Sequence, residues 1–390
     1  MIRTLAVHGY RSLRELVVPL APVTVVTGEN GAGKSSLYRA MRLLAATTST
    51  GVVGPLARDG GLERVLWAGP ERISGAMRRG EVPVQGAHKR LKPVSLMLGV
   101  ATDELGYLID IGLPTPSRTV FVHDPMIKRE AVFVPPLFRP STLMVSRRHR
   151  GVHLHDGRDR RVLTDSLSHR TSMLSEFADP QGYPELLAMR QTFAGWRFYD
   201  SFRTDMDAPA RSRCLGTWTP VLAEDGHDLA AAIATILESA WAGPFDEALE
   251  AAFPGTQVGI AGDQGEFELT VEQPGMLRPL RSSELSDGTL RFLLLAAALL
   301  SPQPPSLLVL NEPETSLHPE VLPVLADLIM KVAERTQVLV VSHSRALIEP
   351  LTAVGDDEMV VHHHLVKNLG ETLIEGQGML TTPPWEWGSR

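Results

Sequence analysis

VTVVTGENGAGKSS occupies residues 23–36 and joins a run of β-branched residues to the pattern G-x-x-x-x-G-K-[ST], which is typical of a P-loop. In such a loop, glycines let backbone N–H groups converge on phosphate oxygens, the lysine reaches the β- and γ-phosphates, and the next hydroxyl binds Mg²⁺. The helix that follows also favours anions at its N-terminus. We therefore expect a nucleotide site at Gly28, Glu29, Asn30, Gly31, Ala32, Gly33, Lys34, Ser35 and Ser36, with Ser35 as a metal ligand.

The composition is that of a folded chain without disulfides. The 390 residues are 43% hydrophobic and 21% charged, enough for two domains or for one large domain with insertions. The net charge of −7 argues against a generally basic nucleic-acid-binding surface. Cys214 is the only cysteine, which excludes an internal disulfide and fits a reducing compartment.

No targeting or membrane signal stands out in the chain. The N-terminal residues lack the apolar region of a signal peptide, and the richest apolar run, Phe292–Leu300, is too short to span a bilayer. We therefore expect a soluble cytoplasmic protein that does not act at a membrane.

Hydrophobic patterns predict mixed α/β structure. Two or three strands precede the P-loop, a helix follows it to about Ala46, and residues 47–62 read as a loop. Short strand-like pieces then predict an antiparallel sheet: Val94–Val100, Gly106–Ile111, Thr119–His123 and Ala131–Val134. Helical spacing follows in residues 165–205 and 227–252, and Val258–Val271 reads as a hairpin.

Two polar segments allow a functional and a structural interpretation. Residues 146–161, SRRHRGVHLHDGRDRR, offer arginines for nucleic-acid phosphates: Arg147, Arg148, Arg150, Arg158, Arg160 and Arg161. No aromatic residue is interleaved for base stacking, so a solvated, partly disordered loop is the competing interpretation. The triplet His362-His363-His364 lies in a strand-like stretch, where neighbours face opposite sides; we interpret it as structural rather than as a metal site.

The second half of the chain carries four further segments with polar residues at strand or helix ends. Leu285–Thr289 is a polar turn that opens a strongly apolar helix, and Leu307–Leu310 is a short apolar strand that ends in Asn311-Glu312. Glu314–Pro319 leads into another helix, and the strand Gln337–Val341 ends in Ser342-His343-Ser344. A P-loop enzyme needs strand-end residues to hold the Mg²⁺ shell and to orient the attacking water; Glu312 suits the second role.

In this order the segments resemble the ABC-type ATPase superfamily. Gly28–Ser35 looks like its Walker A motif, Leu285–Thr289 its signature, Leu307–Glu312 its Walker B motif, Glu314–Pro319 its D-loop and His343 its switch histidine. The phrases GENGAGKSS and EPETSLHP, and Tyr10-Arg11-Ser12 before the first long strand, resemble the RecF/SMC/OLD-like branch, and most closely its bacterial "predicted AAA family ATPase" group.

The resemblance implies an α/β fold, a P-loop NTPase of the ABC-ATPase head type with a mixed or parallel core sheet. It covers residues 1–390 as a single head. Residues 1–55 and 281–390 are expected to form the nucleotide-binding core, residues 56–135 an antiparallel β region, and residues 136–280 an inserted helical lobe.

The resemblance also implies a mechanism. Two copies would dimerise head to tail around two ATP molecules with Mg²⁺. Ser286 and the backbone near Gly288 of one copy would cap the γ-phosphate held by Lys34 of the other, and Arg11 would contact the nucleotide. ATP binding would close the dimer and hydrolysis would open it, which is a ligand-driven population shift.

Three positions depart from the superfamily's pattern. Asp287 stands where the signature has glycine, and Asn311 stands where Walker B has aspartate. Asparagine keeps an acceptor oxygen for the water shell of Mg²⁺ but loses the charge, so we expect slow hydrolysis. The glutamine of the Q-loop has only Gln85 as a candidate.

Three functions are consistent with these motifs. The first is an ATP-hydrolysing, dimerising switch that acts on a protein partner or on DNA, in DNA repair or phage defence. The second is a non-catalytic ATP sensor, in which Asn311 leaves binding intact and turnover negligible. The third, a transporter ATPase, is disfavoured because the helix after Gly288 lacks an arginine-rich continuation. The absence of heptads disfavours long coiled-coil arms, and the residues after His343 are too few for a TOPRIM nuclease domain.

Overall fold

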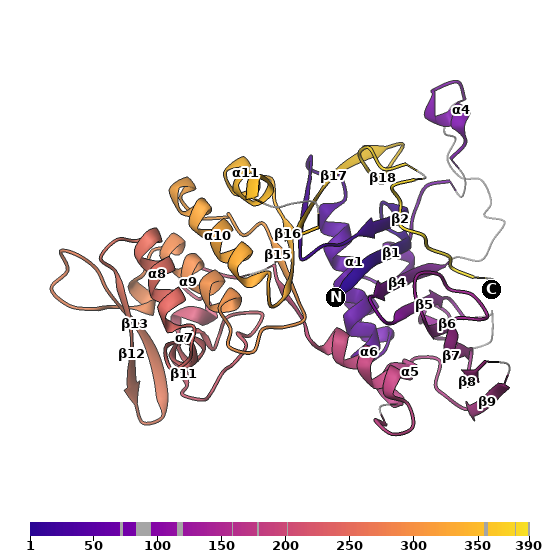
Figure 1. Ribbon diagram of the computed structural model, residues 1–390, viewed down its shortest axis with the longest axis horizontal. Helices are drawn as coiled ribbons and strands as arrows, with labels where there is room; N and C mark the ends of the chain where they lie inside the picture. Colours follow the sequence, from indigo (N-terminus) through magenta and orange to yellow (C-terminus); the bar gives the residue numbers. More distant parts are fainter. Residues whose placement is uncertain are drawn as a thin grey trace. The chain divides into compact units, whose positions relative to one another are not determined.

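The structure is a computed structural model that describes residues 1–70, 73–82, 95–114, 120–157, 159–177, 179–200, 202–354, 358–378 and 380–388 (Figure 1). The chain divides into two compact units. Unit 1 comprises Met1–Leu20, Gly28–Gly195 and His363–Arg390; unit 2 comprises Ala21–Thr27 and Trp196–His362.

Unit 1 is built on an eight-stranded antiparallel sheet with the strand order β2-β1-β4-β5-β6-β7-β8-β9. Its strands are β1 (Ile2–Tyr10), β2 (Leu13–Pro19), β4 (Leu96–Thr102), β5 (Gly106–Gly112), β6 (Met126–Phe133), β7 (Leu143–Arg148), β8 (Gly151–Asp156) and β9 (Asp159–Thr164). The first four strands of this order are rich in Val, Leu and Ile, and β5 is buried along its whole length. Such runs are typical of strands covered on both faces.

Unit 1 also contains helices, among which the P-loop helix packs on this sheet. They are α1 (Lys34–Thr50), α2 (Val53–Arg58), α3 (Leu62–Val65), α4 (Gly75–Arg78), α5 (Met173–Glu176) and α6 (Pro184–Ala194). The P-loop helix α1 contacts β1 and β4 as well as α5 and α6. Leu37, Met41 and Leu44, at helical spacing, form its buried face.

Unit 2 contains a parallel sheet in the order β10-β15-β16-β3. These strands are β10 (Trp196–Tyr199), β15 (Leu307–Asn311), β16 (Gln337–Val341) and β3 (Val23–Gly28, of which the residues to Thr27 belong to this unit). β16 is fully buried, as expected for the interior of a parallel sheet. The register pairs Asn311 with Val341 and Val341 with Val26, so three strands end at the same edge of the sheet.

The helices of unit 2 share one hydrophobic core with that sheet. They are α7 (Leu229–Leu237), α8 (Ala242–Ala252), α9 (Asp287–Leu299), α10 (Leu322–Val332) and α11 (Arg345–Val354), with short 3₁₀ turns η1 (Pro209–Arg211), η2 (Ser282–Glu284) and η3 (Pro319–Val321). α9 is buried from Thr289 to Leu299, which explains why its sequence is apolar on every face.

Two groups of smaller strands complete the architecture. β12 (Gln257–Asp263) and β13 (Glu266–Glu272) form the predicted hairpin, which β11 (Cys214–Leu215) and β14 (Leu280–Arg281) extend. β17 (Val360–Asn368) pairs with β18 (Glu371–Ile374), most of this hairpin lying in unit 1. The predicted α/β P-loop fold, with parallel and antiparallel sheets, is therefore confirmed.

Some details of the sequence prediction are wrong. Residues 47–50 continue α1, because the hydroxyls of Thr47 and Thr48 donate to carbonyls three residues earlier, both at 2.8 Å, and so fit the helix. Residues 120–123 form no strand; Val120 and Phe121 are 86% and 59% exposed, so this apolar run has no buried face.

The basic segment 146–161 is also not a loop. Its described residues lie in β7, β8 and β9 and their turns, and Val145, Arg147 and Val152 supply a buried face. Residues 143–164 thus extend the antiparallel sheet beyond the limit of 135 predicted for it, into the region expected to be a helical lobe. The division into a nucleotide-binding core and a lobe stays a prediction.

The C-terminal tail docks on unit 1. Trp385 and Trp387, with ring centroids 5.4 Å apart, pack on an apolar cluster of Leu108, Ala131 and Phe133. Trp387 Nε1 also donates to Glu15 Oε1 at 2.9 Å. Among the described residues, no helix is long and apolar enough to cross a membrane.

Candidate nucleotide-binding site

The P-loop has the backbone shape that its glycines permit. Gly28, Gly31 and Gly33 have φ of 147°, 82° and 115°, the region that side chains disfavour. A Cβ on Gly28 would lie 2.5 Å from the carbonyl oxygen of Leu365, and one on Gly33 would collide with the hydroxyl of Thr372. Around Gly31 there is open space, so this part of the loop can approach a ligand closely.

Lys34 folds back over the loop. Its Nζ donates to the carbonyl oxygens of Gly28 at 2.5 Å and Glu29 at 3.2 Å, and the residue is only 7% exposed. These carbonyls hold the ammonium group at the head of α1. Of the loop's other predicted residues, four are exposed (Glu29, Asn30, Gly31 and Ser35), Gly28 and Ser36 are half-buried, and Ala32 and Gly33 are buried.

The N-terminus of α1 suits an anion. Within the described part of the chain no side chain caps Gly33, and the first turn of α1 contains no acidic residue. Its first N–H groups and the positive end of its dipole are therefore available, and the exposed Ser35 hydroxyl is free to reach a metal. The residues present fit a phosphate chain with Mg²⁺.

The loop is held in place by β18 of the same unit. Thr372 Oγ1 donates to the carbonyl oxygen of Ala32 at 2.7 Å and contacts Ser12 Oγ at 2.8 Å. The sequence did not single out Thr372; its burial next to a polar loop is visible only in the fold.

Arg11 is engaged inside unit 1. Its guanidinium lies 3.7 Å from the carboxylate of Asp59 and 5.5 Å from the centroid of the Tyr10 ring. Burial, followed by the Asp59 charge, raises the pKa of the Tyr10 hydroxyl, which donates to Asp59 at 3.0 Å. The contact of Arg11 with a nucleotide stays a prediction.

Two strand ends in unit 2 carry the other predicted residues. Asn311 ends β15, and Glu312 follows it with φ of 48°, a left-handed conformation that is strained for a glutamate. Its N–H donates to the carbonyl oxygen of Val341 at 2.8 Å, which ties it to the end of β16. Such strain costs about 1–3 kcal/mol and is concentrated at functional sites.

Glu314 orients the end of β16. Its Oε1 accepts hydrogen bonds from the hydroxyl of Ser342 at 2.7 Å and the N–H of His343 at 3.1 Å, and lies 3.3 Å from His343 Nδ1. Glu314 is buried, whereas the side chain of His343 is 60% exposed. The carboxylate thus fixes the backbone beneath an imidazole that faces solvent. Glu314 was predicted only as part of the D-loop phrase.

Replacing Glu314 by alanine should destabilise the protein. The Ser342 hydroxyl and the His343 N–H would lose their acceptor, and a buried donor without a partner costs about 1–3 kcal/mol. Thermal or urea unfolding measures the loss. Glu320→Ala is the matched control, because Glu320 lies in the same segment but its side chain is 88% exposed. Equal stability of the two variants would contradict this role.

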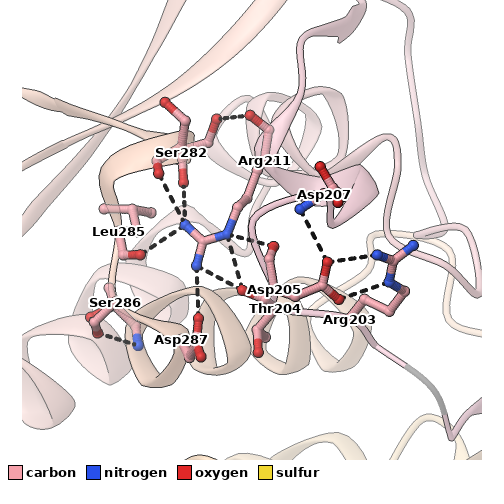
Figure 2. Close-up of polar contacts among 11 residues, drawn as sticks. Arg203, Thr204, Asp205, Asp207, Arg211, Ser282, Leu285, Ser286 and Asp287 are labelled. Atoms are coloured by element: carbon pink, nitrogen blue, oxygen red, sulfur yellow. Dashed lines mark hydrogen bonds and ion pairs between the residues drawn. The ribbon is translucent and has the colours of Figure 1, made fainter.

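The predicted signature segment is capped and tightly packed. Ser286 is the N-cap of α9 and accepts from the N–H of Thr289 at 3.1 Å. A Cβ on Gly288 would lie 2.9 Å from the carbonyl oxygen of Ser316, so the glycine permits close approach of the D-loop. Figure 2 shows that Arg211, which sequence reasoning missed, points into the turn before this helix.

Arg291 of α9 links this helix to the Walker B strand end. Its guanidinium donates to the carbonyl oxygens of Phe202 at 2.9 Å and Glu312 at 3.3 Å. Burial lowers the pKa of Arg291, and the charge of Glu314 opposes that shift. Ser286, Gly288, Glu312 and His343 therefore lie within one contact network of unit 2.

Arg147 is not available to nucleic acid. Its side chain is fully buried, and it pairs with the equally buried Glu130 at 2.6 Å while donating to the carbonyl oxygens of Ser168 and Thr171. The prediction that Arg147 belongs to a nucleic-acid contact is wrong, because its charge neutralises Glu130. Arg148, Arg150, Arg160 and Arg161 are exposed, and their contact with nucleic acid stays a prediction.

Three further predictions concern Gln85, Arg158 and the histidine triplet at residues 362–364. Gln85 and Arg158 lie outside the described residues. His362 Nε2 contacts Thr27 Oγ1 at 2.8 Å, and His363 Nε2 contacts the carbonyl oxygen of Pro19 at 2.7 Å. Where the structure describes the chain, no three His, Cys, Asp or Glu side chains are grouped to hold a metal ion.

Two protein-family models match the chain. A family model described as "AAA domain, putative AbiEii toxin, Type IV TA system" matches residues 126–349, and one described as "AAA domain" matches residues 4–61. The first stretch contains Glu312 and His343; the second contains the P-loop. Among curated proteins none matches.

Several solved structures are similar in fold. The SMC head domain from Thermotoga maritima is 15% identical, with 96% of this chain and 97% of that chain covered and a TM-score of 0.48. The Smc head domain with an extended coiled coil bound to the C-terminal domain of ScpA, from Pyrococcus furiosus, is 13% identical, with 96% and 95% covered and a TM-score of 0.48. The Smc head domain with a coiled coil and joint from Pyrococcus yayanosii is 12% identical, with 98% of each chain covered and a TM-score of 0.47.

Proposed function

The chain belongs to the AAA domain family whose model matches residues 126–349, and from this premise we propose that it binds ATP with Mg²⁺ and hydrolyses it slowly. The family confirms the predicted kinship with AAA-family ATPases and supports nucleotide binding. Hydrolysis, its rate and a dimeric mechanism are our proposals. The test is phosphate release by the full chain, compared with that of Glu312→Gln.

The observation that carries the proposal is the P-loop itself. Three glycines hold positive φ, Lys34 Nζ lies over the carbonyls of Gly28 and Glu29, and the first turn of α1 is free of acidic side chains. On binding, the ammonium group of Lys34 exchanges these carbonyls for β- and γ-phosphate oxygens. Ser35 and Asn311 are the candidates to hold Mg²⁺, which supplies neutralisation of the developing phosphate charge.

The strand ends supply the remaining roles. Glu312 orients the attacking water and accepts its proton, and His343 donates a hydrogen bond to the γ-phosphate, with Glu314 fixing the backbone beneath it. The register that pairs Asn311 with Val341 and Val341 with Val26 supports this assignment. It brings the ends of β15, β16 and β3 to one edge, and β3 continues directly into the P-loop.

We further propose that two copies close head to tail, so that Ser286 and Gly288 of one face the phosphate held by Lys34 of the other. The capped turn at Ser286 and the close approach of Gly288 to Ser316 support a preorganised signature surface. The family description names a putative toxin of a Type IV TA system, which favours a role in such a system over a role in DNA repair.

An ATP sensor with negligible turnover is the second candidate, and Asn311 is the observation that favours it. Asn311→Asp should lower the half-saturating Mg²⁺ concentration by up to about 10–100-fold, the usual range for changes around a metal's ligands, because it restores a negative charge facing the ion. Turnover need not rise, since tighter Mg²⁺ binding also slows release of ADP.

The measurement is the ATPase rate against free Mg²⁺ for both forms, or nucleotide affinity against Mg²⁺ where turnover is absent. Asn368→Asp is the control, because Asn368 is the last residue of β17 and is exposed. Superimposable Mg²⁺ curves for wild type and Asn311→Asp would place residue 311 away from the metal.

A further inference from the structure

Arg211 is buried at the centre of a polar network in unit 2 (Figure 2). Its side chain is 8% exposed, and the guanidinium donates to five backbone carbonyl oxygens, those of Thr204, Asp205, Ser282, Ser283 and Leu285. In return, the hydroxyl of Ser282 donates to the carbonyl oxygen of Arg211 at 2.8 Å. A planar group with five N–H donors is the side chain that can serve so many acceptors at once.

These contacts converge on the turn that leads into α9. Nη1 donates to Ser282 O at 3.1 Å and to Leu285 O at 2.8 Å; Ser282 is the first residue of η2, and Leu285 directly follows it. Leu285 immediately precedes Ser286, the N-cap of α9. The position of the predicted signature segment therefore depends on a residue more than seventy positions earlier in the chain.

The same guanidinium forms an ion pair with Asp287. Nη2 lies 2.9 Å from Asp287 Oδ1, and the Asp287 side chain is 60% exposed in the first turn of α9. A carboxylate there stabilises the helix dipole but repels any phosphate that approaches the same helix end. Because the Asp287 side of this ion pair is exposed, the pair adds little to stability, and its main effect is to neutralise the carboxylate at the surface.

Two neighbouring carboxylates, Asp205 and Glu284, also pair with arginines, but those arginines are exposed. Arg203 pairs with Asp205 at 2.6 Å with both side chains more than half exposed, and Arg278 pairs with Glu284 at 2.6 Å. Hydrogen bonds from Arg278 lower the pKa of Glu284 to about 2. Of these three arginines, Arg211 is the buried one and the one that donates to backbone carbonyls of the turn, and Arg278 reaches the turn through Glu284. Arg203 pairs with Asp205 instead, which makes it a matched control.

We propose that Arg211 is a positioning residue for the signature segment: it fixes the turn Ser282–Leu285 and neutralises Asp287, so that this helix end can face a phosphate despite the carboxylate. The inference rests on the proposed function and goes beyond it. It explains how the chain tolerates aspartate where the superfamily's signature has glycine.

The experiment uses the full chain with Arg211→Met, Arg211→Lys, Asp287→Asn, Arg203→Met and the double variant Arg211→Met/Asp287→Asn. Two quantities are measured: amide hydrogen exchange in residues 285–290 without nucleotide, and the rate of phosphate release. Arg211→Met should speed exchange by about tenfold or more, because local protection reports how well the turn is held. It should lower turnover by a similar factor, whereas Arg203→Met changes neither.

The double variant separates position from charge. Its turnover should be at least about threefold higher than that of Arg211→Met, because the uncompensated charge of Asp287 has been removed. Its amide exchange should stay fast, because the turn still lacks the guanidinium. A purely structural role of Arg211 predicts no such recovery. Where Arg211→Met does not fold, Arg211→Lys, which keeps the charge but loses the forked donors, is compared with wild type and with Arg211→Lys/Asp287→Asn. Fast exchange, together with less than about a threefold difference in turnover between the two lysine variants, supports the proposal, because the lysine already neutralises Asp287. Wild-type exchange, or a larger gain in turnover when Asp287 is removed, contradicts it.

Three results would overturn the proposal: wild-type exchange in Arg211→Met, unchanged turnover despite fast exchange, or a double variant no faster than Arg211→Met. A wild type that releases no phosphate overturns the proposed function and the charge role together. The exchange result still decides whether Arg211 positions the turn, so the two failures are distinguishable.

Discussion

Lys34→Ala should abolish useful ATP binding. The Lys34 ammonium is buried at the head of α1, where its present partners are the carbonyl oxygens of Gly28 and Glu29. Loss of one charged partner from a buried hydrogen-bonded pair costs about 2–5 kcal/mol, which corresponds to roughly a 30- to several-thousand-fold weaker affinity. Titration with a fluorescent ATP analogue measures the change.

Lys331→Ala is the control for this variant. Lys331 pairs with Glu247 at 3.3 Å, both side chains are exposed, and it lies on α10, outside the residues of every predicted motif. It should bind ATP like wild type. Wild-type affinity in Lys34→Ala would remove the P-loop assignment and, with it, the nucleotide site.

Glu312→Gln should retain ATP binding but lose turnover by about 10²–10⁴-fold, the usual contribution of a positioned general base. The amide keeps the size of the side chain and can adopt the same left-handed backbone at φ of 48°, so the strand end and its bond to Val341 should survive. Because hydrolysis opens the proposed dimer, the ATP-bound dimer should accumulate, which light scattering with and without ATP measures.

Glu334→Gln serves as the matched substitution, since Glu334 is exposed in the turn after α10. It should hydrolyse ATP and dissociate like wild type. If Glu312→Gln hydrolyses at the wild-type rate, Glu312 is not the base, and the search would move to His343 and Glu314 at the neighbouring strand end.

The sequence was sufficient for the parts of the site whose chemistry is local. A P-loop is a contiguous pattern, so its glycines, Lys34 and Ser35 could be recognised from spacing alone. The strands β15, which ends in Asn311, and β16, which ends two residues before His343, were also predicted, because short buried parallel strands are continuous apolar runs. The predictions for α7, α8 and the β12–β13 hairpin are also confirmed, because the spacing of apolar residues within each element is a local pattern.

Contacts between distant segments were out of reach of that reasoning. Arg211 and Leu285, or Glu130 and Arg147, are brought together only by the fold, and no local pattern marks an arginine as buried. For segment 146–161 the sequence allowed either a nucleic-acid contact or a solvated loop. Neither interpretation included the strand alternation, in which Arg147 is an inward residue. Thr47 and Thr48 led to a different error, in which the end of a helix was predicted as a loop. Their hydroxyls donate to carbonyl oxygens of the same helix, so these residues do not end it.

The most direct test of an ATPase that works as a dimer is the rate of phosphate release per chain, measured with saturating Mg²⁺ and ATP over a range of protein concentrations. Glu312→Gln, purified in the same way, sets the background. An ATPase that works as a dimer should show a rate above that background which rises with protein concentration and then levels off as dimers form. A rate equal to the background at every concentration would contradict it and leave the ATP sensor as the function of this chain.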